Sequence, residues 1–177
     1  MSLSDWFQSV FASGKTAHGD TDTVRRIVGE LDKLEPDRAR YLAAFAYVLS
    51  RVAAADLDIS EVETARMIEL VQRLGHLPEA QAVVVVEIAR SQNRLFGGTE
   101  NFLVTREFRT IATDAQRAEL LECLFAVAAA DDAISADEEA QIWQIASELG
   151  FEHADYLRVR LTYSDQRTVL RGRAGHD

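Results

Sequence analysis

The sequence has little of several residue types that direct chains to other protein classes. Cys123 is the only cysteine among 177 residues, so no internal disulfide can form, and no Cys or His spacing matches a structural zinc site. Two prolines and nine glycines exclude collagen-like and low-complexity chains. No apolar run approaches the roughly 18 residues that span a bilayer, and the start has no signal-peptide pattern. We expect a cytoplasmic protein without a transmembrane segment.

Basic residues are also scarce. The chain has 19 Lys and Arg against 29 Asp and Glu, a formal charge of −10. Such a field repels nucleic acid and anionic lipid and attracts cations and basic protein surfaces. We therefore expect no nucleic-acid partner.

The pattern of apolar residues indicates an all-α fold. Apolar residues recur every three or four positions, and no stretch alternates as a half-buried strand does. The length fits a single domain, and we predict a single-domain helical bundle of about seven to eight helices. Residues 1–19 are expected to form an amphipathic helix and a linker, 20–163 the helical domain, and 164–177 a disordered tail. The last helix is predicted over 154–163, and Gly75 is expected to end its helix in the left-handed conformation.

An internal repeat organises the domain. Aligning residues 52–75 with 127–150 gives eleven identities in 24 positions, among them Asp56 with Asp131 and Gly75 with Gly150. We infer two helix–loop–helix units related by a pseudo-twofold axis around a shared core, because a helix pair with one apolar stripe must bury it.

The two loops admit a structural and a chemical interpretation. Ser60 with Glu63, and Ser135 with Glu138, fit the capping box SxxE, in which the serine and the glutamate satisfy each other's backbone N–H groups. Ile59 and Ile134 then fit hydrophobic staples. On this interpretation the glutamates serve as caps, and the loops are solvated acidic turns.

The chemical interpretation is a cation site. Nine carboxylates and no Lys or Arg lie in windows 56–63 and 131–139. Asp56 and Asp131 follow helix ends, where the helix dipole disfavours an anion, and a divalent cation or the loop's own amides would compensate. The candidate ligands are Asp56, Asp58, Glu63, Asp131, Asp132 and Glu138. Each loop has the isoleucine and glutamate spacing of an EF-hand but not its first ligands or its glycine. We therefore expect weak affinity, with Ca²⁺ or Mg²⁺ as the candidate cofactor.

Four segments of the chain resemble the tellurite-resistance TerB-like family: AADLDISEVE, AADDAISADEE, TENFLVTREF and ELLECLFAVAAAD. The resemblance covers about residues 37–161. It implies an all-helical bacterial module that chelates metal through Asp56, Glu63, Asp131 and Glu138 and works with membrane-associated partners in stress response. The family's glycine is replaced by Leu57 and by Asp132. Because aspartate tolerates positive φ better than leucine, the second loop is the better candidate metal site.

We therefore expect a non-enzymatic TerB-like module that binds a divalent cation weakly, a basic protein partner, or both. The alternative is a structural interaction module that uses an apolar groove near Trp6 or Trp143, with the acidic loops as caps. No phosphate-binding loop or catalytic pair is apparent. Cys123 lies on an apolar helix, where a buried inert thiol is expected.

Overall fold

The computed structural model describes residues 25–27, 29–53, 60–92, 101–131 and 134–173. Every regular element in this part of the chain is helical, as predicted. After a short helical stretch around Ile27 and Leu31 come α3 (Pro36–Ala53), α4 (Glu61–Leu74), α5 (Glu79–Gln92) and α6 (Asn101–Ile111). They are followed by α7 (Asp114–Ala128), the 3-10 turn η1 (Ala129–Asp131), α8 (Ala136–Leu149) and α9 (His153–Arg173).

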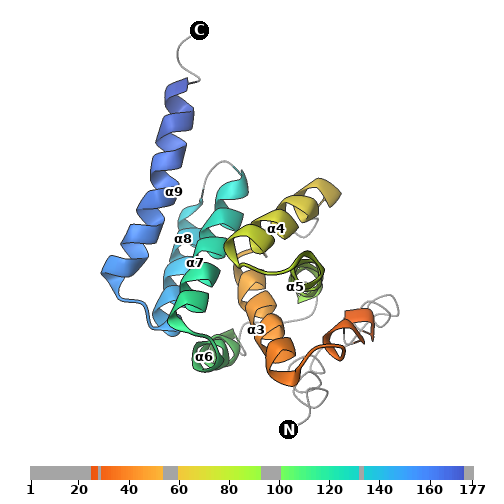
Figure 1. Ribbon diagram of the computed structural model, residues 1–177. Helices are drawn as coiled ribbons and strands as arrows, with labels where there is room; N and C mark the ends of the chain where they lie inside the picture. Colours follow the sequence, from red (N-terminus) through yellow and green to blue (C-terminus); the bar gives the residue numbers. More distant parts are fainter. Residues whose placement is uncertain (1–24, 28, 54–59, 93–100, 132–133, 174–177) are drawn as a thin grey trace.

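Helix α3 is the centre of the bundle. All ten residues from 41 to 50 are buried, and the helix packs against α5, α6, α7 and α8 (Figure 1). Its apolar residues surround it rather than forming one stripe, as expected of a helix buried on all sides. The rings of Tyr41, Phe45 and Phe108 join α3 to α6 with centroids 5.4 to 6.0 Å apart.

Helix α5 contains the valine run 83–86, whose β-branched residues favour strands by propensity. It is nevertheless helical, and Val84, Val85 and Val86 are buried in the core between α3 and α4. Burial of these side chains in the helical core outweighs their local preference for strands.

The two repeat glycines end their helices differently. Gly150 adopts the left-handed conformation (φ 89°) and caps α8. The Phe151 N–H donates to the Ala146 carbonyl at 3.0 Å. Gly75 has φ −83°, so the predicted left-handed conformation is wrong there, and His76 takes positive φ (49°) instead. Gly75 is needed for space, because a Cβ there would lie 2.7 Å from the Val71 carbonyl oxygen and 3.2 Å from the Phe45 ring.

Helix α9 is longer than predicted. It continues to Arg173, so residues 164–173, expected to be a disordered tail, are helical. The segment has no proline and no glycine before Gly172, so nothing local stops the helix. No helix in the described part of the chain is long and apolar enough to cross a membrane.

The helices assigned to the two predicted helix–loop–helix units are α3 with α4 and α7 with α8. The pseudo-twofold relation between them stays a prediction.

Candidate functional site

The helices that follow the two loops begin with the same hydrogen-bonded cap. The Glu63 N–H donates to Ser60 Oγ at 3.2 Å, and the Ser60 N–H donates to Glu63 Oε2 at 2.6 Å. At α8 the corresponding distances between Ser135 and Glu138 are 3.2 and 2.7 Å. Both predicted capping boxes are confirmed. Ile134, the staple before the second box, packs against the core, whereas Ile59 lies outside the described residues.

The cap keeps Glu63 ionised. Hydrogen bonding to the Ser60 side chain, and then to its backbone N–H, lowers the pKa of Glu63 below its ordinary value. The same first turns contain further carboxylates, namely Glu61 in α4 and Asp137 and Glu139 in α8. Glu61, Glu63 and Asp137 are exposed.

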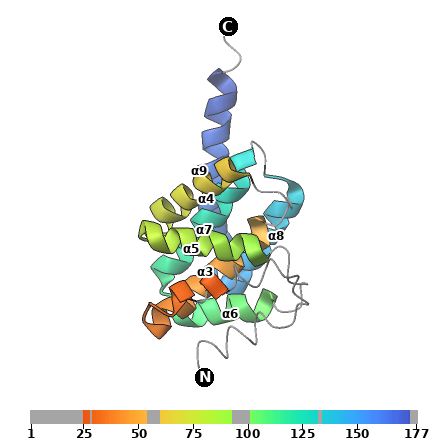
Figure 2. The same ribbon diagram turned by 90° about the vertical axis from the view of Figure 1, so that its right-hand side faces the viewer.

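These acidic helix starts lie toward the same end of the bundle, the end from which α9 projects (Figures 1 and 2). Arg66 of α4 donates to the carbonyl of Ala130, in the turn that opens the second loop, at 3.4 Å. Ser60 is six residues before Arg66, about 9 Å along a helix axis. We call the first-turn carboxylates Glu61, Glu63, Asp137, Glu138 and Glu139 the acidic end.

Helix α9 is fastened beside the acidic end. Arg160 Nε pairs with Glu139 Oε1 at 2.6 Å. The Tyr156 ring lies 4.8 Å from Trp143 and 5.5 Å from Phe125 between ring centroids. Trp143 is therefore partly buried against α9.

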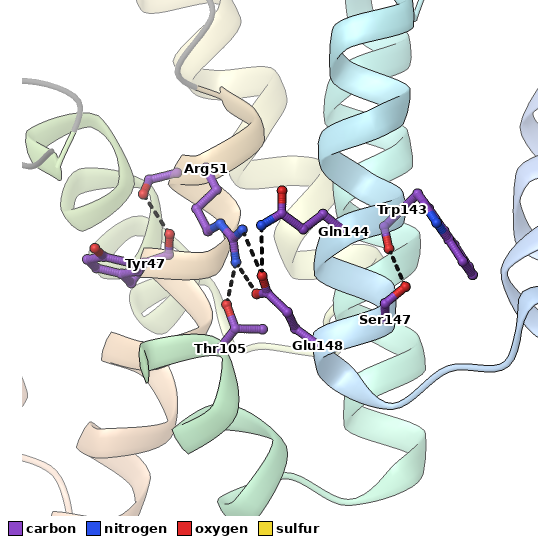
Figure 3. A network of polar contacts seen from close by, with 8 residues as sticks. Tyr47, Arg51, Thr105, Trp143, Gln144, Ser147 and Glu148 are labelled. Atoms are coloured by element: carbon purple, nitrogen blue, oxygen red, sulfur yellow. Dashed lines mark hydrogen bonds and ion pairs between the residues drawn. The ribbon is translucent and has the colours of Figure 1, made fainter. Parts of the chain in front are cut away.

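A buried polar cluster joins the last turn of α3 to α6 and α8 (Figure 3). Arg51 Nη1 donates to Glu148 Oε2 at 2.5 Å and to Thr105 Oγ1 at 2.6 Å, and Gln144 Nε2 donates to Glu148 Oε1 at 3.1 Å. The side chains of Arg51 and Glu148 are only 2% and 9% exposed. Burial raises the pKa of Glu148, but the hydrogen bond and charge of Arg51 outweigh that effect and the pKa is lowered.

The Arg51 cluster was not predicted from the sequence. Arg51 and Glu148 are 97 residues apart, and each resembles an ordinary surface residue in its own helix. The available signal is that Arg51 is the only charged residue in the stretch from 41 to 53. The cluster fixes the end of α3 directly before residues 54–59, and thereby the place from which the first acidic loop departs.

The family model described as Tellurite resistance protein TerB matches residues 41–161. The chain belongs to the TerB family. The match begins inside α3 and ends inside α9, close to the range 37–161 over which the sequence resembled that family. No curated protein and no solved structure matches the chain.

The predicted metal ligands of this TerB domain are only partly within the described residues. Asp56, Asp58 and Asp132 lie outside them, and Asp131 is described only through its backbone, as the last residue of η1. Glu63 and Glu138 are the capping glutamates. Among the residues that the structure describes, no three Asp, Glu, His or Cys side chains gather as a metal site would require. The ligand set therefore stays a prediction.

The remaining reactive side chains of the TerB domain have structural surroundings. Cys123 is fully buried, and burial raises the pKa of its thiol, in agreement with the predicted inert thiol. His76 is exposed beside Glu119, with Nδ1 3.2 Å from Oε1. The His153 ring meets the Trp143 ring edge to face and stacks on the Tyr156 ring. His18 and His176 lie outside the described residues.

Proposed function

We propose that this TerB-family protein is a non-enzymatic cytoplasmic binding module whose acidic end binds a divalent cation weakly, a basic protein surface, or both. The supporting observation is that α4 packs against α7 and that Arg66 of α4 donates to the Ala130 carbonyl, in the turn that opens the second loop, at 3.4 Å. Acidic first turns from both units consequently share one end of the bundle. Carboxylates concentrated in this way attract cations and basic surfaces.

The capping geometry supports weak rather than tight cation binding. In the described bonds, Glu63 and Glu138 each use Oε2 for the cap. A carboxylate oxygen that already accepts a backbone N–H is held in the geometry of the cap and has less capacity left for an ion, whereas EF-hands use a bidentate glutamate at this position. We propose Asp131 and Asp132 as the main ligands, assisted by Glu138, with Asp56, Asp58 and Glu63 forming a weaker equivalent in the first loop.

The description of the family supports a proposal for the cellular role of the protein. Membership in a family described by tellurite resistance supports a role in bacterial stress response, and a membrane-associated protein is the proposed partner. A basic cytoplasmic segment of such a partner would complement the acidic end.

A structural interaction module remains the second candidate, because both loop glutamates are observed in the role of caps. The packing of Trp143 against Tyr156 and His153 weakens the part of this hypothesis that requires a groove at Trp143. Trp6 lies outside the described residues, so its contribution stays a prediction.

A cation titration tests the proposed function. Amide NMR spectra of the metal-stripped full chain are recorded with increasing Ca²⁺ or Mg²⁺, for the original protein and for Asp131→Asn. We expect saturable shifts centred on residues 131–139 that the substitution abolishes. Asp114→Asn is the matched control, because it makes the same charge change in the first turn of α7, at the other end of that helix from Asp131.

Two results would count against the cation proposal: no saturable shift at millimolar cation, or equal shifts in the original protein and Asp131→Asn. A peptide rich in Lys and Arg, titrated in EDTA, tests the basic-partner alternative in the same spectra. Loss of partner binding on removal of residues 1–19, without an effect of Asp131→Asn, would favour the structural interaction module.

A further inference from the structure

Helix α6 presents a mixed apolar and basic surface to solvent. Its exposed residues form what we call the α6 face: Phe102, Leu103, Arg106, Arg109 and Thr110. At 3.6 residues per turn these positions fall within about a third of the helix circumference, and the other side of α6 packs on α3 and α8. Four large apolar side chains are exposed in the described part of the chain, and two of them, Phe102 (51%) and Leu103 (62%), adjoin on this face. Adjoining apolar residues beside arginines suit a binding surface, because Phe and Arg are enriched where proteins meet.

The start of the chain contains a segment that needs such a surface. The described chain begins at Arg25, and residues 1–24 precede it. Within residues 3–11, apolar residues recur at the three- and four-residue spacing of a helix: Leu3, Trp6, Phe7, Val10 and Phe11. A helix this short is marginal in water unless its apolar side packs on something. We therefore expect the segment to bind an apolar surface.

The segment can reach the α6 face of its own molecule. Residues 12–24 connect it to Arg25. Fully extended, this connection spans about 45 Å, whereas a domain of this size is about 40 Å across. The first described helical stretch, drawn in red, and α6 also lie toward the same end of the bundle, opposite the end from which α9 projects (Figures 1 and 2). A short flexible connection holds the segment at an effective concentration of about a millimolar, so a weak contact is sufficient for docking.

Charge and concentration favour this segment over a lipid surface or a second copy. Residues 1–14 contain Asp5 and no Lys or Arg, so the segment brings no basic side chain toward Arg106 and Arg109. Anionic lipid would attract these two arginines, but it repels a chain with a formal charge of −10. The segment of a second copy reaches millimolar concentration only in a millimolar solution, whereas the chain's own segment is tethered at that concentration.

We propose that residues 3–11 form a helix that docks on the α6 face of the same molecule, with Trp6 and Phe7 packed on Phe102 and Leu103. The aliphatic stems of the two arginines extend this contact, while their charged groups stay in water. The α6 face is then closed to other partners unless they displace the segment. The docking does not depend on the cation binding proposed above.

The fluorescence of Trp6 tests the proposal. The chain has two tryptophans, so Trp143→Phe leaves Trp6 as the only one, and this full-length protein is the reference. Emission spectra and acrylamide quenching are recorded in EDTA at micromolar concentration, where a cation is absent and association between copies is disfavoured. Circular dichroism checks that the reference and each variant retain their fold.

Two variants of the reference separate the α6 face from other exposed apolar residues. The α6 variant adds Phe102→Ser with Leu103→Ser. The control instead adds Val62→Ser with Leu161→Ser, which removes two exposed apolar side chains (79% and 52%) from α4 and α9. We expect blue-shifted emission and slow quenching in the reference and the control. In the α6 variant the emission should shift to the red, and quenching should approach that of the urea-unfolded protein.

A second measurement leaves Trp143 in place. In the otherwise original full chain, Trp6→Ser with Phe7→Ser should shift the amide NMR signals of residues 102–110 and leave those of residues 153–163 unchanged. Equal Trp6 emission in the reference and the α6 variant, or unchanged signals of residues 102–110, would overturn the proposal. Protection of Trp6 that is lost on dilution would assign the contact to a second copy. Protection that appears only with phosphatidylglycerol vesicles would assign it to lipid, and either result refutes docking within one molecule.

Discussion

The buried pair of Arg51 and Glu148 gives the sharpest test of how this domain is held together. Replacing Arg51 with Met keeps the aliphatic length of the side chain but removes the charge and the donors that face Glu148 and Thr105. Glu148, whose side chain is only 9% exposed, then lacks a cationic partner. Removing one member of a buried pair costs about 3 to 5 kcal/mol, a large part of the roughly 5 to 15 kcal/mol by which a domain is stable.

A double variant distinguishes the contribution of the ion pair from the cost of leaving one buried charge unpaired. Arg51→Met with Glu148→Met removes both charges, so the desolvation that burdens an unpaired carboxylate disappears. We expect the double variant to be more stable than Arg51→Met alone. The free energy of unfolding is measured by urea denaturation for the original protein, both single variants and the double variant, which completes a double-mutant cycle.

The pH dependence of stability provides an independent test of the pairing between Arg51 and Glu148. In the original protein the folded-state pKa of Glu148 is lowered, so the pair contributes stability above the ordinary carboxyl range, about pH 4.3, and loses it as the pH falls through the folded-state pKa. In Arg51→Met, burial raises that pKa instead, and a protonated Glu148 is no longer penalised. The destabilisation by Arg51→Met should therefore shrink between pH 7 and pH 4.

The exposed pair Arg158 with Asp155 provides the control, because Arg158→Met removes an arginine that is 76% exposed. Surface pairs contribute about 0 to 1 kcal/mol. If Arg51→Met costs no more than Arg158→Met at pH 7, or if the double variant is less stable than Arg51→Met, the assignment of Arg51 as the buried partner of Glu148 is wrong.

Three further predictions concern local features of the domain. Ser135→Ala removes the acceptor of the Glu138 N–H and should lower the free energy of unfolding by about 1 kcal/mol in urea titrations; an unchanged value would mean that the cap contributes nothing. Gly150→Ala places a Cβ at φ 89° and 2.8 Å from the Arg109 guanidinium and should cost at least about 1 kcal/mol, which thermal unfolding would reveal as a lower Tm. Cys123, buried and with a raised thiol pKa, should resist iodoacetamide in the folded protein at pH 8 and react in urea, and rapid labelling without denaturant would contradict its burial.

Local chemistry explains which features could be predicted. The two capping boxes each depend on residues three positions apart, and the family resemblance depends on four short segments; both predictions are confirmed. The predicted ligands Asp56, Asp58, Asp131 and Asp132 remain predictions, because their side chains lie outside the described residues. The segment 164–173 was expected to form a disordered tail, whereas α9 continues to Arg173, because the segment contains no helix breaker before Gly172.

By itself, the sequence determined the helices, their capped starts and the two acidic turns, since periodicity and capping act between residues three or four apart. The tertiary structure decided what those helices meet. It paired Arg51 with Glu148 across 97 positions. It made Gly75 necessary for the close approach of Phe45 rather than for a left-handed turn, and it set the acidic first turns of α4 and α8 at the end from which α9 projects. These outcomes depend on which surfaces are buried together, and burial is a property of the packed chain.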